Sequence, residues 1–242
     1  NNKVLQSSVE LDLVHEDYDL TASFESYETQ SGTNSDRYQY VLPSYYFSKN
    51  FDFKNIDGSF NFSSSGNNTL HTTNITETTL FNNLNFTGTE FFFNNGIKNN
   101  FEISLKNING VGKNSPQYST KPRSDLISTY VYNTSLPLIQ NTQKYLNTLE
   151  PKASLRFTPH EMKNHKTLVR RIDMNNIFNK DRLSMGNTLE GGESLTIGLD
   201  FKREKNNIEN ELQDLQDYID LKLATVLRLE KENHIPMSST LN

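Results

Sequence analysis

The chain has no cysteine and no tryptophan among its 242 residues. Without cysteine it forms no disulfide bond and offers no thiolate to a metal. It also lacks any run near the roughly 20 apolar residues that a membrane-spanning helix needs, and its mean hydropathy is −0.70. These absences exclude a helical membrane protein. The first residues do not have the pattern of a signal peptide, so we expect the chain to be processed or to be a fragment.

Signals of enzymatic chemistry are also missing. No Gly-x-Ser-x-Gly motif frames a nucleophile, and no glycine-rich loop ends in Lys-Ser or Lys-Thr. The net charge of −5 gives no reason to expect a clustered basic face, so nucleic acid is not an expected partner. We therefore expect a protein without catalytic activity, cofactor or metal.

What the chain does have is alternation of apolar and polar residues, together with 15 Phe and 11 Tyr. A period of two predicts β-strands with one apolar face. The alternating segments are 9–13, 20–24, 38–42, 51–53, 60–62, 91–93, 101–105, 127–132, 153–157, 195–201 and 221–229. No helices separate them, so a parallel α/β fold is not expected. Many short strands joined by turns predict a sandwich or a barrel.

Turn signals divide these strands. Asp57-Gly58 and Asn95-Gly96 predict two-residue hairpin turns, and Asn109-Gly110 is expected to end a strand. The proline-containing stretches 111–125 and 158–166 are predicted to be loops, because proline lacks the backbone donor that a central strand uses.

One region is ambiguous. Residues 206–217 are read as a polar loop that holds at most a short helix, with a strand beginning near Tyr218. The spacing of Ile208, Leu212, Leu215 and Ile219 is also that of a helix, which in the competing interpretation continues through Leu229.

A few side chains could form a site. His160 and His165, with Glu161 between them, suggest a metal site, but solvated loop histidines are the favoured interpretation because the spacing is not a compact ligand motif. His15 and His71 are single residues and are read in the same way. Glu190 and Glu193 flank two glycines, which suggests a calcium site or, more simply, a polar turn. No catalytic, cofactor-binding or metal site is therefore assigned, and the substrate-binding residues are unknown.

The aromatic clusters 45–47 and 91–93 place aromatic residues on both faces of a strand. At the rim of a membrane barrel they fit an interfacial aromatic girdle. In a soluble sandwich they would fill the core and its edge. The pattern alone leaves both open.

Several stretches resemble the LPS-assembly protein (LptD) family, also called organic solvent tolerance proteins. Residues 149–157 are similar to the family's Leu-Glu-Pro-Arg/Lys strand in mid-barrel. Residues 176–184 resemble the following Asp-Arg loop, and residues 190–199 the Glu-Gly-Gly strand entry. Residues 36–43 and 223–241 are similar to an earlier and a later strand. The matches lie in the family's order and span most of the chain.

The resemblance implies an all-β fold: 1–242 as one partial, antiparallel transmembrane β-barrel domain with open edges. The family's N-terminal periplasmic jelly-roll, the C-terminal barrel strands and the lateral gate are expected to lie outside this chain. The implied location is the outer membrane of a Gram-negative bacterium.

The implied function is non-catalytic transport of lipopolysaccharide into the outer leaflet. The implied partners are lipopolysaccharide, outer-membrane lipid, an LptE-like lipoprotein plug and the periplasmic Lpt bridge. On this hypothesis Leu221, Leu223, Leu227 and Leu229 meet lipid, while Lys222 and Arg228 face the lumen. The alternatives are a porin-like channel, a soluble β-sandwich binding module and a barrel hydrolase, the last disfavoured by the missing nucleophile.

Overall fold

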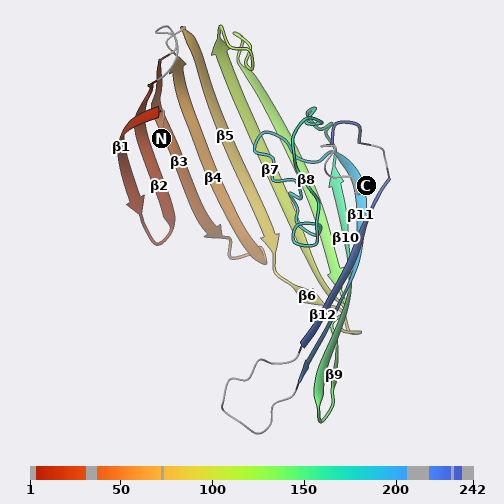
Figure 1. The fold of residues 1–242 in the computed structure, drawn as a ribbon. Coiled ribbons are helices and arrows are strands. Elements are labelled where there is room, and N and C mark those ends of the chain that lie inside the picture. The colour runs from red at the N-terminus through yellow and green to blue at the C-terminus, as the bar shows by residue number, and fades with distance from the viewer. Residues whose placement is uncertain (1–3, 31–36, 72–73, 206–217, 230–231, 236–242) are drawn as a thin grey trace. The chain divides into compact units, whose positions relative to one another are not determined.

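A computed structural model describes residues 4–30, 37–71, 74–205, 218–229 and 232–235. Within these ranges the chain folds into a 12-stranded sheet (Figure 1) and contains no helix. The pairings of neighbouring strands are antiparallel. The predicted all-β, antiparallel fold is thus confirmed. No described helix is long and apolar enough to cross a bilayer.

The strands follow the chain in almost simple order. They are β1 (Val4–Val14), β2 (Tyr18–Thr29), β3 (Tyr38–Asp52), β4 (Gly58–His71), β5 (Ile75–Gly88), β6 (Phe91–Phe92), β7 (Lys98–Lys113), β8 (Arg123–Ser135), β9 (Leu138–Asn141), β10 (Tyr145–Thr158), β11 (Gly192–Lys205) and β12 (Tyr218–Arg228). Each long strand pairs with its neighbours in sequence, while β6 adds to β7 and β9 to β10.

The chain divides into two compact units. Unit 1 comprises Asn1–Phe86 with Ser104–Ile127, and unit 2 comprises Thr87–Ile103 with Ser128–Asn242. The strands β5, β7 and β8 therefore contribute residues to both units.

In unit 2 the sheet has an apolar and a polar face. Leu223 pairs with Leu199 and Leu221 with Phe201, so aliphatic and aromatic residues of β11 and β12 share one face. Thr196 and Val226 pair on the opposite face. The leucines of β12 remain about half exposed: Leu221 50%, Leu223 56% and Leu227 49%. The predicted alternation of β12 is confirmed, and the competing helix through Leu229 is wrong.

Unit 1 has the same alternation. Leu11 pairs with Ala22, and Leu13 with Leu20, on the apolar face of β1 and β2. The aromatic rings of β3 to β5 continue this face through contacts between Phe47 and Phe62, Phe51 and Phe60, and Phe60 and Phe86. Because side chains of a strand alternate between faces, the serine and asparagine residues between them point to the other side.

Proline is accommodated in two strands where the ladder is interrupted. Pro43 lies in β3 at a register shift relative to both β2 and β4. Pro151 lies in β10 between the residues that pair with β9, ending at Leu149, and those that pair with β8, starting at Lys152. A missing backbone donor costs little at such a break. The predicted short strand 153–157 is therefore too short, because β10 runs through Pro151.

Other predicted boundaries also need correction. Asn109-Gly110 does not end a strand, since β7 continues to Lys113. The Asp57-Gly58 and Asn95-Gly96 hairpins form, but each connection has five residues, 53–57 and 93–97, rather than two. The β12 strand begins at Tyr218, as expected. The polar loop 206–217 lies outside the described residues.

The longest described connection is residues 159–191, between β10 and β11, which we call the strap. It has no strand or helix. It nevertheless holds most of the buried hydrophobic residues described: Met162, Ile177, Leu183, Met185 and Leu189, against Ile108, Ile127 and Val131 elsewhere. Met162, Leu183 and Met185 form a cluster against which Ile172 and Ile235 pack. The core of unit 2 is thus built by the strap and not by the apolar face of the sheet.

Candidate functional site

Three arginine side chains surround the buried carboxylate of Glu190, near the end of the strap. The Nε and Nη2 atoms of Arg182 donate to its two carboxylate oxygens at 2.9 and 2.7 Å. Arg182 also donates to Thr196 Oγ1 at 3.2 Å and to Ser194 Oγ at 2.9 Å, both on β11. A fork of this kind joins two parallel charge-assisted hydrogen bonds and fixes the orientation of both groups.

Two further arginines reach the same carboxylate from the strands. Arg228 of β12 donates from Nε at 3.2 Å and from Nη2 at 2.9 Å to Glu190 Oε1. Arg156 of β10 places Nη1 3.5 Å from Oε2, and its Nε donates to the carbonyl of Lys180 at 3.1 Å. One carboxylate therefore connects the strap to β10 and β12, while Arg182 connects it to β11. We call these four residues the Glu190 cluster.

Three of the four side chains of the cluster are almost fully withdrawn from water, and that of Arg228 is 29% exposed. The side chains of Glu190 and Arg182 are each 1% exposed and that of Arg156 is 4% exposed. Burial by itself would raise the pKa of Glu190, but Arg156, Arg182 and Arg228 outweigh it and keep this pKa below its ordinary value. Burial lowers the pKa of Arg182. The terminal nitrogens of Arg156 are buried and make no hydrogen bond.

A second attachment of the strap lies further along the polar face. The ring of Phe178 is seated directly on Gly198 of β11: a Cβ built on Gly198 would lie 2.6 Å from Phe178 Cζ. The ammonium of Lys152 lies 4.7 Å from the centre of the same ring, and it pairs with Asp200 at 2.5 Å. Only a residue without a side chain lets the ring approach the sheet so closely.

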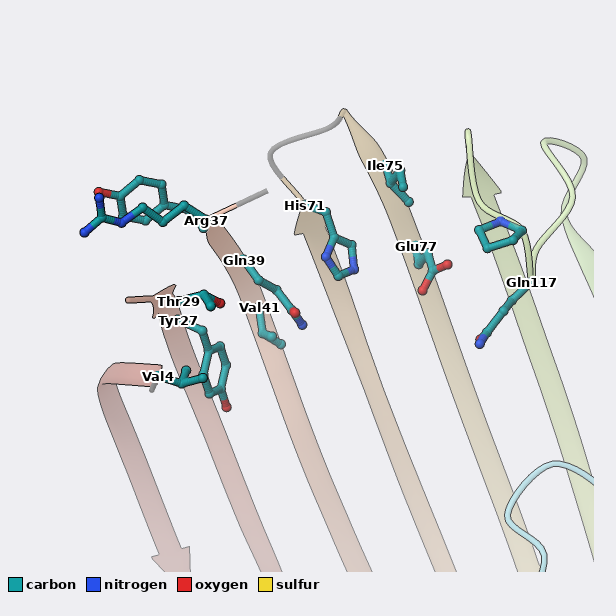
Figure 2. A pocket seen from close by; sticks show the side chains of 12 residues that line it. Val4, Tyr27, Thr29, Arg37, Gln39, Val41, His71, Ile75, Glu77 and Gln117 are labelled. Carbon is teal, nitrogen blue, oxygen red and sulfur yellow. The ribbon is translucent and has the colours of Figure 1, made fainter. Parts of the chain in front are cut away.

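Unit 1 contains a cavity of about 690 Å³. It lies at one end of β2 to β5 (Figure 2), where Gln39, His71 and Glu77 come from three neighbouring strands. Gln117, from the loop between β7 and β8, also lines it. The lining is mixed, since apolar side chains such as Val41 and Ile75 lie beside these polar ones.

The loop between β7 and β8, which belongs to unit 1 and lines part of this cavity, packs against β5 and β7. Ser115 donates to Glu77 at 2.5 Å, and the ring of Tyr118 covers Gly110, where an added Cβ would lie 2.7 Å from it. Burial, followed by the nearby charge of Glu77, raises the pKa of Tyr118. The sequence suggested Gly110 as a strand end. In the structure the ring of Tyr118 packs directly on this glycine instead.

The histidines and the glutamate singled out from the sequence lie in different surroundings in the structure. His160 and Glu161 are exposed and line a cavity of about 440 Å³ together with Glu193. His165 is not part of this group: burial lowers its pKa, and its Nε2 is buried without a hydrogen-bond partner. His15 stacks on Tyr18, and His71 lines the large cavity. No three His, Cys, Asp or Glu side chains in the described part of the chain are arranged to hold a metal ion.

Glu190 requires a correction. The sequence paired it with Glu193 in a polar turn, yet Glu193 is exposed while Glu190 is buried against arginine. Sequence reasoning missed Arg156 and Arg182 as partners, although both lie in segments noted for their family resemblance. No local spacing could have found Arg156 and Arg228, because they are 34 and 38 residues from Glu190 in the sequence.

Comparison with known proteins adds no identification: the sequence matches no protein-family model and no curated protein.

Proposed function

We propose that this chain is a segment of an outer-membrane β-barrel that moves lipopolysaccharide into the outer leaflet. One observation carries the proposal: the sheet leaves its apolar face uncovered while its polar face receives the strap. In a water-soluble protein the arrangement would be reversed, with the strap covering the apolar face.

The exposed apolar face is energetically costly in water. Leu221, Leu223 and Leu227 are each about half exposed, and burial of the rest of each side chain is worth roughly 1 kcal/mol. Similar exposure holds for Leu155 at 54% and Ile197 at 44%. Lipid tails would cover these residues without any change in the protein, which is how strands of membrane barrels are stabilised.

A β-sandwich would need a second sheet over that face. All twelve described strands belong to one sheet instead. Backbone groups within a bilayer must be paired, and for strands only a closed barrel achieves this. The proposal therefore requires that the sheet closes into a barrel, either on itself or with further strands.

The polar face suits a cargo with a large hydrophilic head. In unit 2 it carries charged side chains: Lys152 is bound to Asp200 at 2.5 Å, and Glu102 lies 3.8 Å from Lys180 of the strap. In unit 1 it is hydroxyl- and amide-rich, as in the pairs Ser23 with Ser44 and Ser104 with Asn85. Sugars and phosphates would pass along such a surface while acyl chains stay in lipid. Lipopolysaccharide as the cargo, and the plug and bridge proteins as partners, rest on the family resemblance.

The first experiment is to refold the full chain in buffer and in detergent or lipid vesicles, with far-UV circular dichroism and size exclusion. We expect β structure that requires detergent or lipid, and aggregation in buffer. A soluble, cooperatively folding monomer in plain buffer would contradict a membrane location. Transfer of labelled lipopolysaccharide between vesicles by the parent protein then separates this transport function from a porin-like channel, which would pass only small solutes.

A further inference from the structure

The strap covers polar residues that a bilayer barrel would expose to its interior. Thr158, Ser194 and Thr196 are 2%, 4% and 2% exposed, and Arg182 binds the last two directly. If the polar face lines a water-filled path, the strap occupies part of that path. This step rests on the proposed function.

The strap is held by few groups. Its ring anchor is Phe178 on Gly198, its small apolar cluster is formed by Met162, Leu183 and Met185, and its charged anchor is Glu190. Of these three anchors, only Glu190 forms ion pairs with residues of two strands, Arg156 and Arg228, and also with a residue of the strap, Arg182. Its carboxylate accepts hydrogen bonds from both Arg182 and Arg228.

We propose that the strap is a movable constriction of the polar path in unit 2, and that Glu190 is the latch that keeps it closed. A single carboxylate can hold the strap closed because it faces more than one positive charge. Glu190 faces three guanidinium groups, and Arg156 has no hydrogen bond from its terminal nitrogens even with the latch in place. When the carboxylate is neutralised, the buried Arg156 and Arg182 and the partly exposed Arg228 lose the anion that they share, and lifting the strap into water relieves the repulsion between these cations.

The titratable and charged groups that face Glu190 come from every element packed around it. They are Arg156 of β10, Arg228 of β12 and Arg182 of the strap, with Asp181 acting on Arg156. Ser194 and Thr196 of β11 supply only hydroxyl groups. A charge change at Glu190 is thus not balanced by a second carboxylate on β11.

The test compares Glu190→Gln with Glu193→Gln in the full chain in lipid vesicles. Glu193 is three residues away and exposed, so it is a matched control. Trypsin cleavage after Arg182 reports a lifted strap, because that residue is buried, and cleavage after the exposed Arg171 serves as an internal reference. We expect at least tenfold faster cleavage after Arg182 in Glu190→Gln and no change in Glu193→Gln.

Conductance across a planar bilayer tests whether the strap narrows a path. We expect larger unitary conductance for Glu190→Gln than for the native chain and for Glu193→Gln. Equal cleavage and equal conductance in both variants would overturn the latch. If Glu190→Gln fails to fold, Gly198→Ala replaces it, since it loosens the ring anchor without changing a charge. A third outcome is faster cleavage of Glu190→Gln with no conductance in any variant or in the native chain. That result would support the role of Glu190 in holding the strap, but it would contradict a path through the membrane and therefore the proposed function.

Discussion

Arg182 and Glu190, eight residues apart in the strap, form a bidentate ion pair whose two side chains are each 1% exposed. A pair this deeply buried adds little stability by comparison with apolar residues of the same shape, but removal of one partner leaves an uncompensated charge. The pair therefore determines how the strap is attached more than how stable the chain is overall.

Removal of either charge from this pair should weaken unit 2. We expect Glu190→Gln and Arg182→Met each to lower the free energy of unfolding by about 3–5 kcal/mol. The double variant should lose less than the sum of the two, because it leaves fewer unpaired charges. Denaturant unfolding in detergent, arranged as a double-mutant cycle, measures this coupling. Additive losses would indicate that the two groups act independently.

The Glu190 cluster should also make stability depend on acid. The pKa of Glu190 is lowered from 4.5 in the folded chain. Its contribution is therefore complete above pH 4.5 and is lost as the pH falls through the lower, folded value. We expect the strap to stay closed from pH 8 to 5, and the protection of its backbone amides near Arg182, measured by hydrogen exchange, to decline only after the pH has fallen below 4.5. In Glu190→Gln this acid-dependent decline should disappear, whereas Glu193→Gln should retain it.

Gly198 offers a test of the ring anchor. An alanine there would place its Cβ 2.6 Å from Phe178 Cζ and 3.2 Å from the Leu223 carbonyl oxygen. We expect Gly198→Ala to displace the ring and destabilise the strap by about 1–3 kcal/mol. Gly186, which lies in the strap itself, is a suitable control, because nothing lies within 4 Å of its added Cβ. Equal melting temperatures for Gly198→Ala and Gly186→Ala would mean that the ring is free to move aside.

The absence of tryptophan allows a direct test of which face meets lipid. Single variants Leu223→Trp and Lys222→Trp place the one tryptophan of the chain on opposite faces of β12. In vesicles containing lipids brominated in their acyl chains, we expect strong quenching at position 223 and weak quenching at position 222. Stronger quenching at position 222 would reverse the faces. Weak quenching at both would place β12 outside the bilayer.

The strands and their two faces could be predicted from the sequence because consecutive side chains of a strand point to opposite sides. Leu221, Leu223 and Leu227 were assigned to one face of β12 and Lys222 and Arg228 to the other from their spacing alone. That inference needs no knowledge of neighbouring strands. It depends only on local backbone geometry and on the polarity of each residue.

Strand ends and the candidate site needed the tertiary structure. Pro151 lies inside β10 because different strands pair with the two halves of β10: β9 pairs with the residues before the proline, and β8 pairs with those after it. Gly110 lies inside β7 under the ring of Tyr118, and Gly198 lies under Phe178. Each of these outcomes depends on a neighbour that is distant in sequence or follows a turn, and local propensity carries no information about such neighbours.

The sequence by itself therefore determined an all-β chain with amphipathic strands, no thiol chemistry and no long apolar helix. Only the tertiary structure decided that the strap covers the polar face, and that Glu190 meets Arg156 and Arg228 across 34 and 38 residues. The physical reason is that alternation is a property of one strand. An ion pair between a loop and two strands depends instead on how the chain returns to the sheet, and that is set by packing and by the cost of leaving buried charges unpaired.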